Sequence, residues 1–156
     1  MIRVVLLLAL SLQCVLSDDG CYNGWAAYEG YCYGFFVEDV SWLLASANCD
    51  LFGARLAEID SKQRETWLSQ QLVVKKLPVA WIGLSSRLHP GVWQWTPSNR
   101  DVSRYVNWIP GEPNNYGNNE QCVELKSTGG WNDLNCLTAR KFICEKKLDT
   151  THIKKG

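Results

Sequence analysis

The 156-residue chain lacks an excess of charge of either sign, since 16 Lys and Arg balance 16 Asp and Glu. A neutral chain has no long-range field to attract nucleic acid, so we expect no nucleic-acid partner. Internal repeats, heptads and a collagen period are also absent, which argues against a stalk or a solenoid. Hydrophobic residues make up 46% of the chain, which excludes a disordered protein, and the length allows one domain.

Long apolar runs are scarce as well, and the single one, at residues 4–10, follows Arg3. This order is typical of a secretory signal peptide, and the residues before position 18 place the cleavage after Ser17. The run is shorter than the roughly 20 residues of a membrane-spanning helix, so we interpret it as a signal and not as an anchor. The sequence therefore predicts a secreted, extracellular protein that does not span a membrane, with residues 1–17 removed.

Cysteine is the abundant exception, and its use indicates an oxidising compartment. Removing residues 1–17 takes away Cys14 and leaves six of the seven cysteines. An even number predicts full pairing with no reactive thiol, so any homo-oligomer should be non-covalent. Six cysteines allow 15 pairings, and spacing alone does not choose among them. They are Cys21, Cys32, Cys49, Cys122, Cys136 and Cys144.

The pattern of residues 18–147 predicts an α+β domain, with two helices early and strands and a long loop late. The first helix, over residues 41–51, places Trp42, Ala45 and Cys49 on one face. The second begins at Asp60 as its N-cap and has Leu68 and Leu72, with Trp67, as its buried face. One or two short strands should lie around Gly30, and further strands over residues 54–59, 79–84, 92–95, 121–126, 131–136 and 140–147. Residues 148–156 read as a flexible polar tail.

Residues 96–120 form a segment rich in Pro, Gly and Asn, and a loop of that length in a compact domain is usually functional. This loop and the strands after it carry oxygen ligands without a nearby His or free thiolate. Three carboxylates and two carboxamides suit a hard cation, above all Ca²⁺, and argue against zinc. These candidate ligands are Glu112, Asn114, Glu120, Asn132 and Asp133.

Five side-chain oxygens and one backbone carbonyl would leave one or two positions open on an eight-coordinate ion. Two neighbouring sugar hydroxyls fit such positions. A cis bond before Pro113 would turn Glu112 and Asn114 to the same side of the loop. The carboxylate of Glu112 accepts hydrogen bonds whereas the amide of Asn114 donates them, so the pair should select the stereochemistry of a diol.

Four short motifs in this chain resemble the C-type lectin-like domains. They are Trp-Ile-Gly-Leu at residues 81–84, Glu-Pro-Asn at 112–114, Trp-Asn-Asp at 131–133 and Phe-Ile-Cys-Glu at 142–145. The resemblance runs from Cys21 to Glu145. It implies a compact fold of two helices, small antiparallel sheets and a long calcium-binding loop, with neighbouring termini. It also implies the bridges Cys49–Cys144 and Cys122–Cys136, with Cys21–Cys32 as the extra pair of the family's long form.

By this resemblance the five candidate ligands match the primary calcium and sugar site. Glu-Pro-Asn is the family's mannose-type triplet and implies mannose, N-acetylglucosamine or fucose. Residues 85–90, where many relatives hold an auxiliary calcium, contain no acid and include Arg87, so we expect one calcium per domain. Tyr116 lies two residues past Asn114 and is the candidate for stacking on a sugar or for packing within the loop. Most of the eight tryptophans should be core residues instead.

The sequence therefore predicts a calcium-dependent lectin that binds glycans on cell or microbial surfaces or on glycoproteins, in innate immune recognition or agglutination. No enzyme is expected: Glu112 and Glu120 could be proposed as a glycosidase pair, but metal ligands stay ionised, which makes a poor general acid. The alternative is a mineral-binding or protein-binding matrix protein, because the chain also resembles shell-matrix proteins of the perlucin type. A small secreted hydrolase lacks a catalytic group.

Overall fold

The computed structural model describes residues 20–149, so the expected signal peptide and residues 150–156 of the expected tail lie outside the described residues. The elements are β1 (Ala26–Tyr28), β2 (Tyr31–Val40), α1 (Trp42–Leu51), β3 (Arg55–Leu56), α2 (Lys62–Val74), β4 (Val79–Ser85), β5 (Gln94–Trp95), the 3-10 turns η1 (Val102–Arg104) and η2 (Tyr116–Asn118), β6 (Cys122–Lys126), β7 (Trp131–Leu134) and β8 (Arg140–Lys147). This order confirms the predicted α+β class.

Helix α1 forms where the apolar spacing predicts it. Ser41 caps it by accepting the Leu44 N–H at 3.4 Å, and the three predicted face residues are buried against β3, β4 and β8. Gly53 ends the helix region with a positive φ of 59°, as expected. Within residues 20–149, neither helix is long and apolar enough to cross a membrane.

Helix α2 forms as predicted, but the prediction that Asp60 is its N-cap was wrong. The cap is Ser61, whose hydroxyl accepts the Arg64 N–H at 3.2 Å. Asp60 is drawn away because its carboxylate pairs with the Arg64 guanidinium at 2.9 Å. Leu68 and Leu72 are fully buried.

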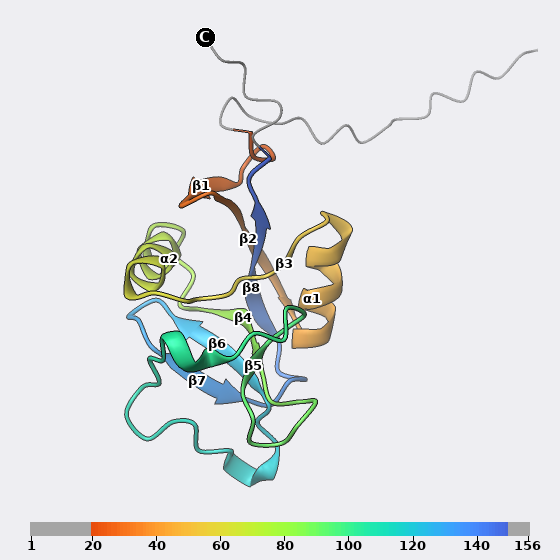
Figure 1. Ribbon diagram of the computed structural model, residues 1–156, viewed down its shortest axis with the longest axis vertical. Helices are drawn as coiled ribbons and strands as arrows, with labels where there is room; N and C mark the ends of the chain where they lie inside the picture. Colours follow the sequence, from red (N-terminus) through yellow and green to blue (C-terminus); the bar gives the residue numbers. More distant parts are fainter. Residues whose placement is uncertain (1–19, 150–156) are drawn as a thin grey trace, which may run out of the picture.

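The strands form a single sheet in the order β1-β2-β8-β4-β6-β7, with β3 added to β8 and β5 to β4. All pairs are antiparallel except β4 with β8, which pair in parallel at Trp81 and Phe142. We expected several small antiparallel sheets, but one sheet is found, because this parallel contact joins the antiparallel parts. The strands expected over residues 54–59 and 92–95 are shorter, and β2 is longer than expected. In Figure 1, α1 and α2 lie on opposite sides of the β2–β8 pair, and the loop between β5 and β6 reaches the end away from β1.

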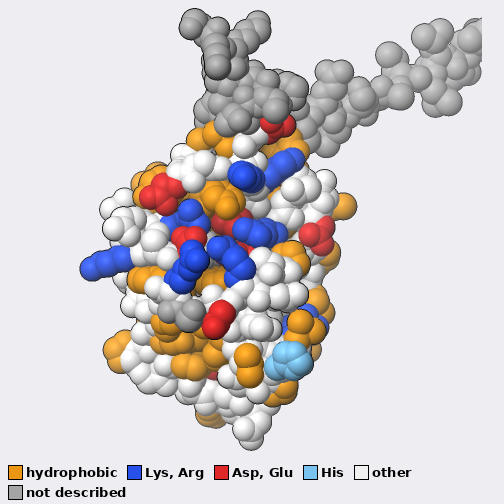
Figure 2. Space-filling view, in the orientation of Figure 1, with side chains coloured by type: hydrophobic (Ala, Val, Ile, Leu, Met, Phe, Trp, Pro, Cys, Tyr) orange, Lys and Arg blue, Asp and Glu red, His pale blue; other side chains and the backbone are white. Residues whose placement is uncertain are grey.

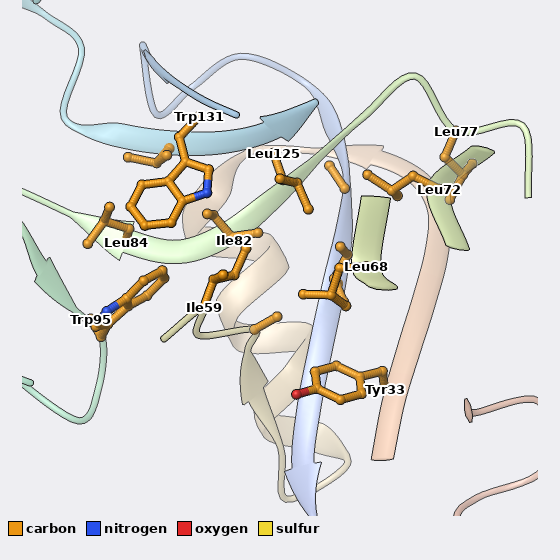
Figure 3. Close-up of a cluster of buried hydrophobic side chains, with 14 residues drawn as sticks. Tyr33, Ile59, Leu68, Leu72, Leu77, Ile82, Leu84, Trp95, Leu125 and Trp131 are labelled. Atoms are coloured by element: carbon orange, nitrogen blue, oxygen red, sulfur yellow. The ribbon is translucent and has the colours of Figure 1, made fainter. Parts of the chain in front are cut away.

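The core gathers around β4. Figure 3 shows Ile82 and Leu84 of this strand facing Leu125 of β6, Trp131 of β7 and Leu68 of α2. Gly83 serves a close approach, because a Cβ there would lie 2.9 Å from the Leu56 carbonyl oxygen. Only glycine lets the backbone after β3 cross so near β4.

Three disulfides staple the domain, Cys21–Cys32, Cys49–Cys144 and Cys122–Cys136, which are the pairings that the resemblance implies. Cys49–Cys144 joins α1 to β8 across 95 residues, which the chain-entropy model values at about 4–5 kcal/mol. Cys122–Cys136 joins the start of β6 to the segment after β7. The described ends lie side by side, since Gly20 and Asp149 line the same pocket.

Candidate functional site

The loop between β5 and β6 is docked on β7 before it reaches the predicted site residues. The Trp131 N–H donates to the Asn107 carbonyl at 2.8 Å, and the Ile109 N–H donates to the Trp131 carbonyl at 3.0 Å. Trp108 packs edge-on against the Trp131 ring at 5.8 Å. A Cβ at Gly130 would lie 2.5 Å from Ile109, so a side chain there would push the loop off the strand. The loop is therefore held in place by the core.

Asp133 organises the next part of the loop. It lies on β7, is 1% exposed, and its two carboxylate oxygens accept the N–H groups of Asn114 at 3.1 Å and Asn115 at 2.8 Å. Asn115 has a positive φ of 46°, a conformation that Asn tolerates better than most residues. A strand carboxylate thus fixes the backbone just after Pro113.

Asn114 joins two further carboxylates to this arrangement. Its amide nitrogen donates to Glu112 Oε1 at 2.9 Å and its backbone N–H donates to Glu112 Oε2 at 3.0 Å. The Tyr116 N–H donates both to Asn114 Oδ1 at 2.7 Å and to Glu120 Oε2 at 2.9 Å. The Glu112–Pro113 bond is cis, and the hydrogen bonds place Glu112 and Asn114 on the same side. The structure therefore brings four of the five predicted ligands together.

The fifth residue, Asn132, stands apart from that hydrogen-bonded set. Its amide nitrogen donates to Glu124 Oε1 at 3.2 Å. Glu124 is 1% exposed and is paired with Lys126 at 2.5 Å and with Arg140 at 2.6 Å. Because the amide nitrogen is engaged by Glu124, the carboxamide oxygen is the atom of Asn132 that remains for a cation.

Glu112, Glu120 and Asp133 have no basic partner in the described part of the chain. By contrast, three deeply buried acids elsewhere each pair with arginine: Glu58 with Arg100, Glu124 with Arg140 and Glu145 with Arg55. Figure 2 shows Lys and Arg gathered over the middle and upper parts of one face, and none at the lower end, where Figure 1 places η2. The end of the loop around η2, together with Asp133, thus carries negative charge that no basic side chain among the described residues compensates.

The pKa of Glu112 reflects its place beside Asp133. Burial, and then the neighbouring Asp133 carboxylate, raise the pKa of Glu112, although the N–H of Asn114 opposes this. In the described part of the chain, no group of three or more Asp, Glu, His or Cys side chains that could hold a metal ion is found, so carboxamide and backbone oxygens would have to contribute to any such site. Hard oxygen donors that share negative charge fit a calcium ion.

Sequence reasoning missed two residues that support this arrangement. Asn115 accepts the Glu120 N–H through its side chain at 3.1 Å, besides donating to Asp133. Its signal was the adjacent pair of Asn residues, since Asn is favoured at left-handed turn positions. Glu124 orients Asn132, and its signal was a charged residue between the apolar Val123 and Leu125 at the centre of a strand.

The aromatic residues divide as expected. Trp42, Trp81, Trp95 and Trp131 are buried, and the other four tryptophans are half-buried. Tyr116 is 79% exposed beside the loop acids, and no ring contact involving it is found among the described residues.

Residues 38–146 match the Lectin C-type domain. The chain belongs to the C-type lectin domain family. It is 40% identical to C-type lectin lectoxin-Lio1 of Erythrolamprus poecilogyrus over 148 residues, which cover 90% of this chain and 89% of that one.

Solved structures support the same fold assignment. The carbohydrate-recognition domain of the mouse scavenger receptor C-type lectin superposes with a TM-score of 0.76 at 28% identity, covering 84% of this chain and 99% of that chain. Herring type II antifreeze protein superposes with a TM-score of 0.73 at 25% identity, covering 83% and 100%. The chain is thus a lectin domain of a family that in general binds carbohydrate and calcium without catalysis, although the same fold also serves other proteins.

Proposed function

We propose that this protein is a secreted, calcium-dependent lectin for mannose-type sugars, with residues 1–17 as its signal peptide and 18–147 as its carbohydrate-recognition domain. The observation that carries the proposal is the set of loop carboxylates that converge on one stretch of backbone and have no basic partner among the described residues. Three negative charges held together in this way favour a bound cation. Their hard oxygen donors favour calcium.

The side-chain oxygens of Glu112, Asn114, Glu120, Asn132 and Asp133 would hold one calcium ion. When bound, the ion supplies open coordination positions that two neighbouring sugar hydroxyls can complete. Glu112 accepts a hydrogen bond from one hydroxyl and Asn114 donates one to the other, which favours the diol of mannose, N-acetylglucosamine or fucose. Tyr116, exposed beside them, would pack on the sugar ring.

The ligands are glycans on cell or microbial surfaces or on glycoproteins, and nothing in the site acts as a catalyst. One metal-bound diol is a small contact, so single-site affinity is expected at about 1 mM or somewhat tighter. Agglutination or microbe recognition would then need several sites at once, which a non-covalent homo-oligomer provides.

The test is a titration with methyl α-mannoside, followed by calorimetry, in calcium and in excess EDTA. Binding should require calcium, and Glu120→Gln should abolish it. Glu38→Gln is the matched control, because it removes the same charge from an exposed residue of β2. Equal binding in calcium and in EDTA would contradict the proposed mechanism.

Similarity to herring type II antifreeze protein supports a second candidate function, that of a mineral-binding or protein-binding matrix protein. An acidic loop can bind the calcium ions at the surface of a crystal, just as it can bind one isolated calcium ion. Retention on calcium carbonate that survives excess mannoside, together with a glycan array without signal, would favour this candidate.

A further inference from the structure

Helix α1 is apolar on its outer side as well as on the side that packs on β3, β4 and β8. A surface helix ordinarily carries polar and charged residues away from the core, and a helix that is apolar all round is usually buried. In Figure 1, no other described element covers the outer side of α1. Four apolar residues lie exposed on this side: Leu43, Leu44, Ala47 and Leu51.

These four residues form one continuous stripe, which we call the α1 stripe. Successive residues turn by about 100° around a helix, so all four fall within a sector of about 100° and reach about 12 Å along the axis. Leu51 is 83% exposed, and Leu43 and Leu44 are half exposed. A contiguous apolar patch of this kind on the surface of a domain marks a contact with another protein.

One charged residue of each sign flanks the stripe, at opposite ends of the helix. Asp50 adjoins the stripe in the last turn, and the guanidinium of Arg87 lies over the Trp42 ring, 5.7 Å from its centroid, at the first turn. Both charged side chains are exposed, and neither takes part in an ion pair among residues 20–149. Helical geometry places Asp50 and Trp42 on the same side of the stripe, so the two charges lie along one edge of it.

This pattern is complementary to itself when a second copy lies antiparallel. A two-fold axis through Ala47, which is midway between Leu43 and Leu51, sets each of these leucines opposite the other one of the second copy. The small side chain of Ala47 at the crossing lets the two helices approach closely. The same rotation sets Asp50 of each copy beside Arg87 of the other, whereas a parallel arrangement would leave both charges unpaired.

The helix dipole favours the same arrangement. Helix α1 has no acid in its first turn and no base in its last turn, so its own side chains do not compensate its dipole. Asp50 instead adds negative charge near the negative end of the helix. An antiparallel neighbour would bring this carboxylate to the positive end of the second helix, where it is favourable.

We propose that the α1 stripe is the interface of a non-covalent homodimer, in which two copies pair their α1 helices antiparallel about a two-fold axis through Ala47. The contact involves about two helical turns from each copy, so it belongs with the small interfaces that bury less than about 1,200 Å² in total. We expect a reversible dimer with a dissociation constant of about 10–100 µM. A chain without net charge does not repel its own copies.

This dimer would give the lectin two sugar sites that face in opposite directions, a consequence that rests on the proposed function. In Figure 1, α1 runs along the long axis of the molecule and begins at the end nearer to η2. Antiparallel pairing reverses this axis in the second copy, so the two η2 loops lie at opposite ends of the dimer. Such a dimer links two separate surfaces, as agglutination requires, and does not set both sites on one surface.

The test is sedimentation velocity of the whole secreted protein in excess EDTA and without sugar, so that the outcome is independent of the calcium site. The concentrations extend from about tenfold below to about tenfold above the expected dissociation constant. Leu51→Lys places a charge in the stripe and should weaken association more than about tenfold. Val74→Lys is the matched control, because it makes the same kind of change at a residue of α2 that is 73% exposed, and it should leave association unchanged.

Two charge reversals test the antiparallel arrangement itself. Asp50→Arg sets like charges against Arg87 of the other copy, and Arg87→Glu sets like charges against Asp50, so each variant alone should associate about fivefold more weakly. In an equal mixture of the two variants, both pairs in the heterodimer have opposite signs again, and association should return to the strength of the wild-type protein. This recovery would also show that both variants are folded.

The interface is overturned if the wild-type protein stays monomeric over this range, if association survives Leu51→Lys, or if the mixture associates no more strongly than its components. Agglutination of mannan-coated beads in calcium tests the consequence: Leu51→Lys should keep calorimetric mannoside binding and lose agglutination. A monomeric Leu51→Lys protein that still agglutinates beads would overturn the linking role. A wild-type dimer that binds no mannoside in calcium would contradict the proposed function and support the interface.

Discussion

Asp133→Ala should separate the two roles that the structure gives this carboxylate. In metal-free protein the substitution removes the acceptor for the N–H groups of Asn114 and Asn115. Asn114 keeps Glu112 Oε2 at 3.0 Å, so Asn115 is the residue that loses its described acceptor. A hydrogen bond to a charged group contributes about 1.5–3 kcal/mol. Because relief of repulsion with Glu112 offsets part of the loss, we expect the free energy of unfolding in EDTA to fall by about 2 kcal/mol.

Calcium should widen the difference in unfolding free energy between the wild-type protein and Asp133→Ala. At a calcium concentration 100 times the dissociation constant, binding stabilises the native protein by about 2.7 kcal/mol, and the variant should lose this gain. The total deficit in calcium then approaches about 5 kcal/mol. Urea denaturation followed by tryptophan fluorescence, with calcium and with EDTA, measures both terms.

Asn132→Ala is the matched control, since it also removes a proposed ligand but touches neither loop N–H. It should lose the calcium gain and cost about 1 kcal/mol or less in EDTA, through its hydrogen bond to Glu124. The reasoning is refuted if Asp133→Ala and Asn132→Ala are equally stable in EDTA, or if either variant retains the full calcium gain.

The remaining predictions concern specificity and pH. Glu112→Gln combined with Asn114→Asp should shift preference from mannose toward galactose on a glycan array, and an unchanged array would show that the acceptor and donor pair does not select the sugar. Calcium affinity should fall as pH drops toward about 5, because protons compete for the loop carboxylates and the raised pKa of Glu112 brings this competition in earlier; calorimetry at several pH values measures it. Tyr116→Ala should weaken mannoside binding several-fold in a calorimetric titration and leave calcium affinity unchanged, because the ring would contact the sugar alone. Burial raises the pKa of Glu145 to about 7 against the attraction of Arg55, so its contribution to stability is full below about pH 4.5 and is lost as pH rises through about 7. Glu145→Gln should therefore flatten the change in unfolding free energy between pH 5 and 8 in EDTA, measured by urea denaturation, and an unaltered slope would contradict the assignment.

Both helices could be predicted because their apolar residues recur at helical spacing and their ends carry capping residues. The choice between neighbouring caps could not, since Asp60 and Ser61 are both suitable and the ion pair with Arg64 decided between them. The lengths of the strands could not be predicted either. Residues 57–59 are all buried, and an alternating pattern does not reveal that the chain leaves the sheet there.

The candidate loop residues were recognisable from their chemistry, because carboxylates and carboxamides among Pro and Gly indicate a site for a hard cation. Their support was not recognisable. Asp133 holds the backbone of Asn115 across 18 residues, and Glu124 holds the amide of Asn132 across the β6–β7 pair, so both contacts depend on how the chain folds back on itself.

By itself the sequence determined the family, the class of fold and the number of cysteines to be paired, because these follow from short motifs, residue type and local spacing. The tertiary structure alone decided which acids are neutralised by arginine and which are left without a partner. Charge compensation depends on distance in space, and the folding of the sheet sets that distance.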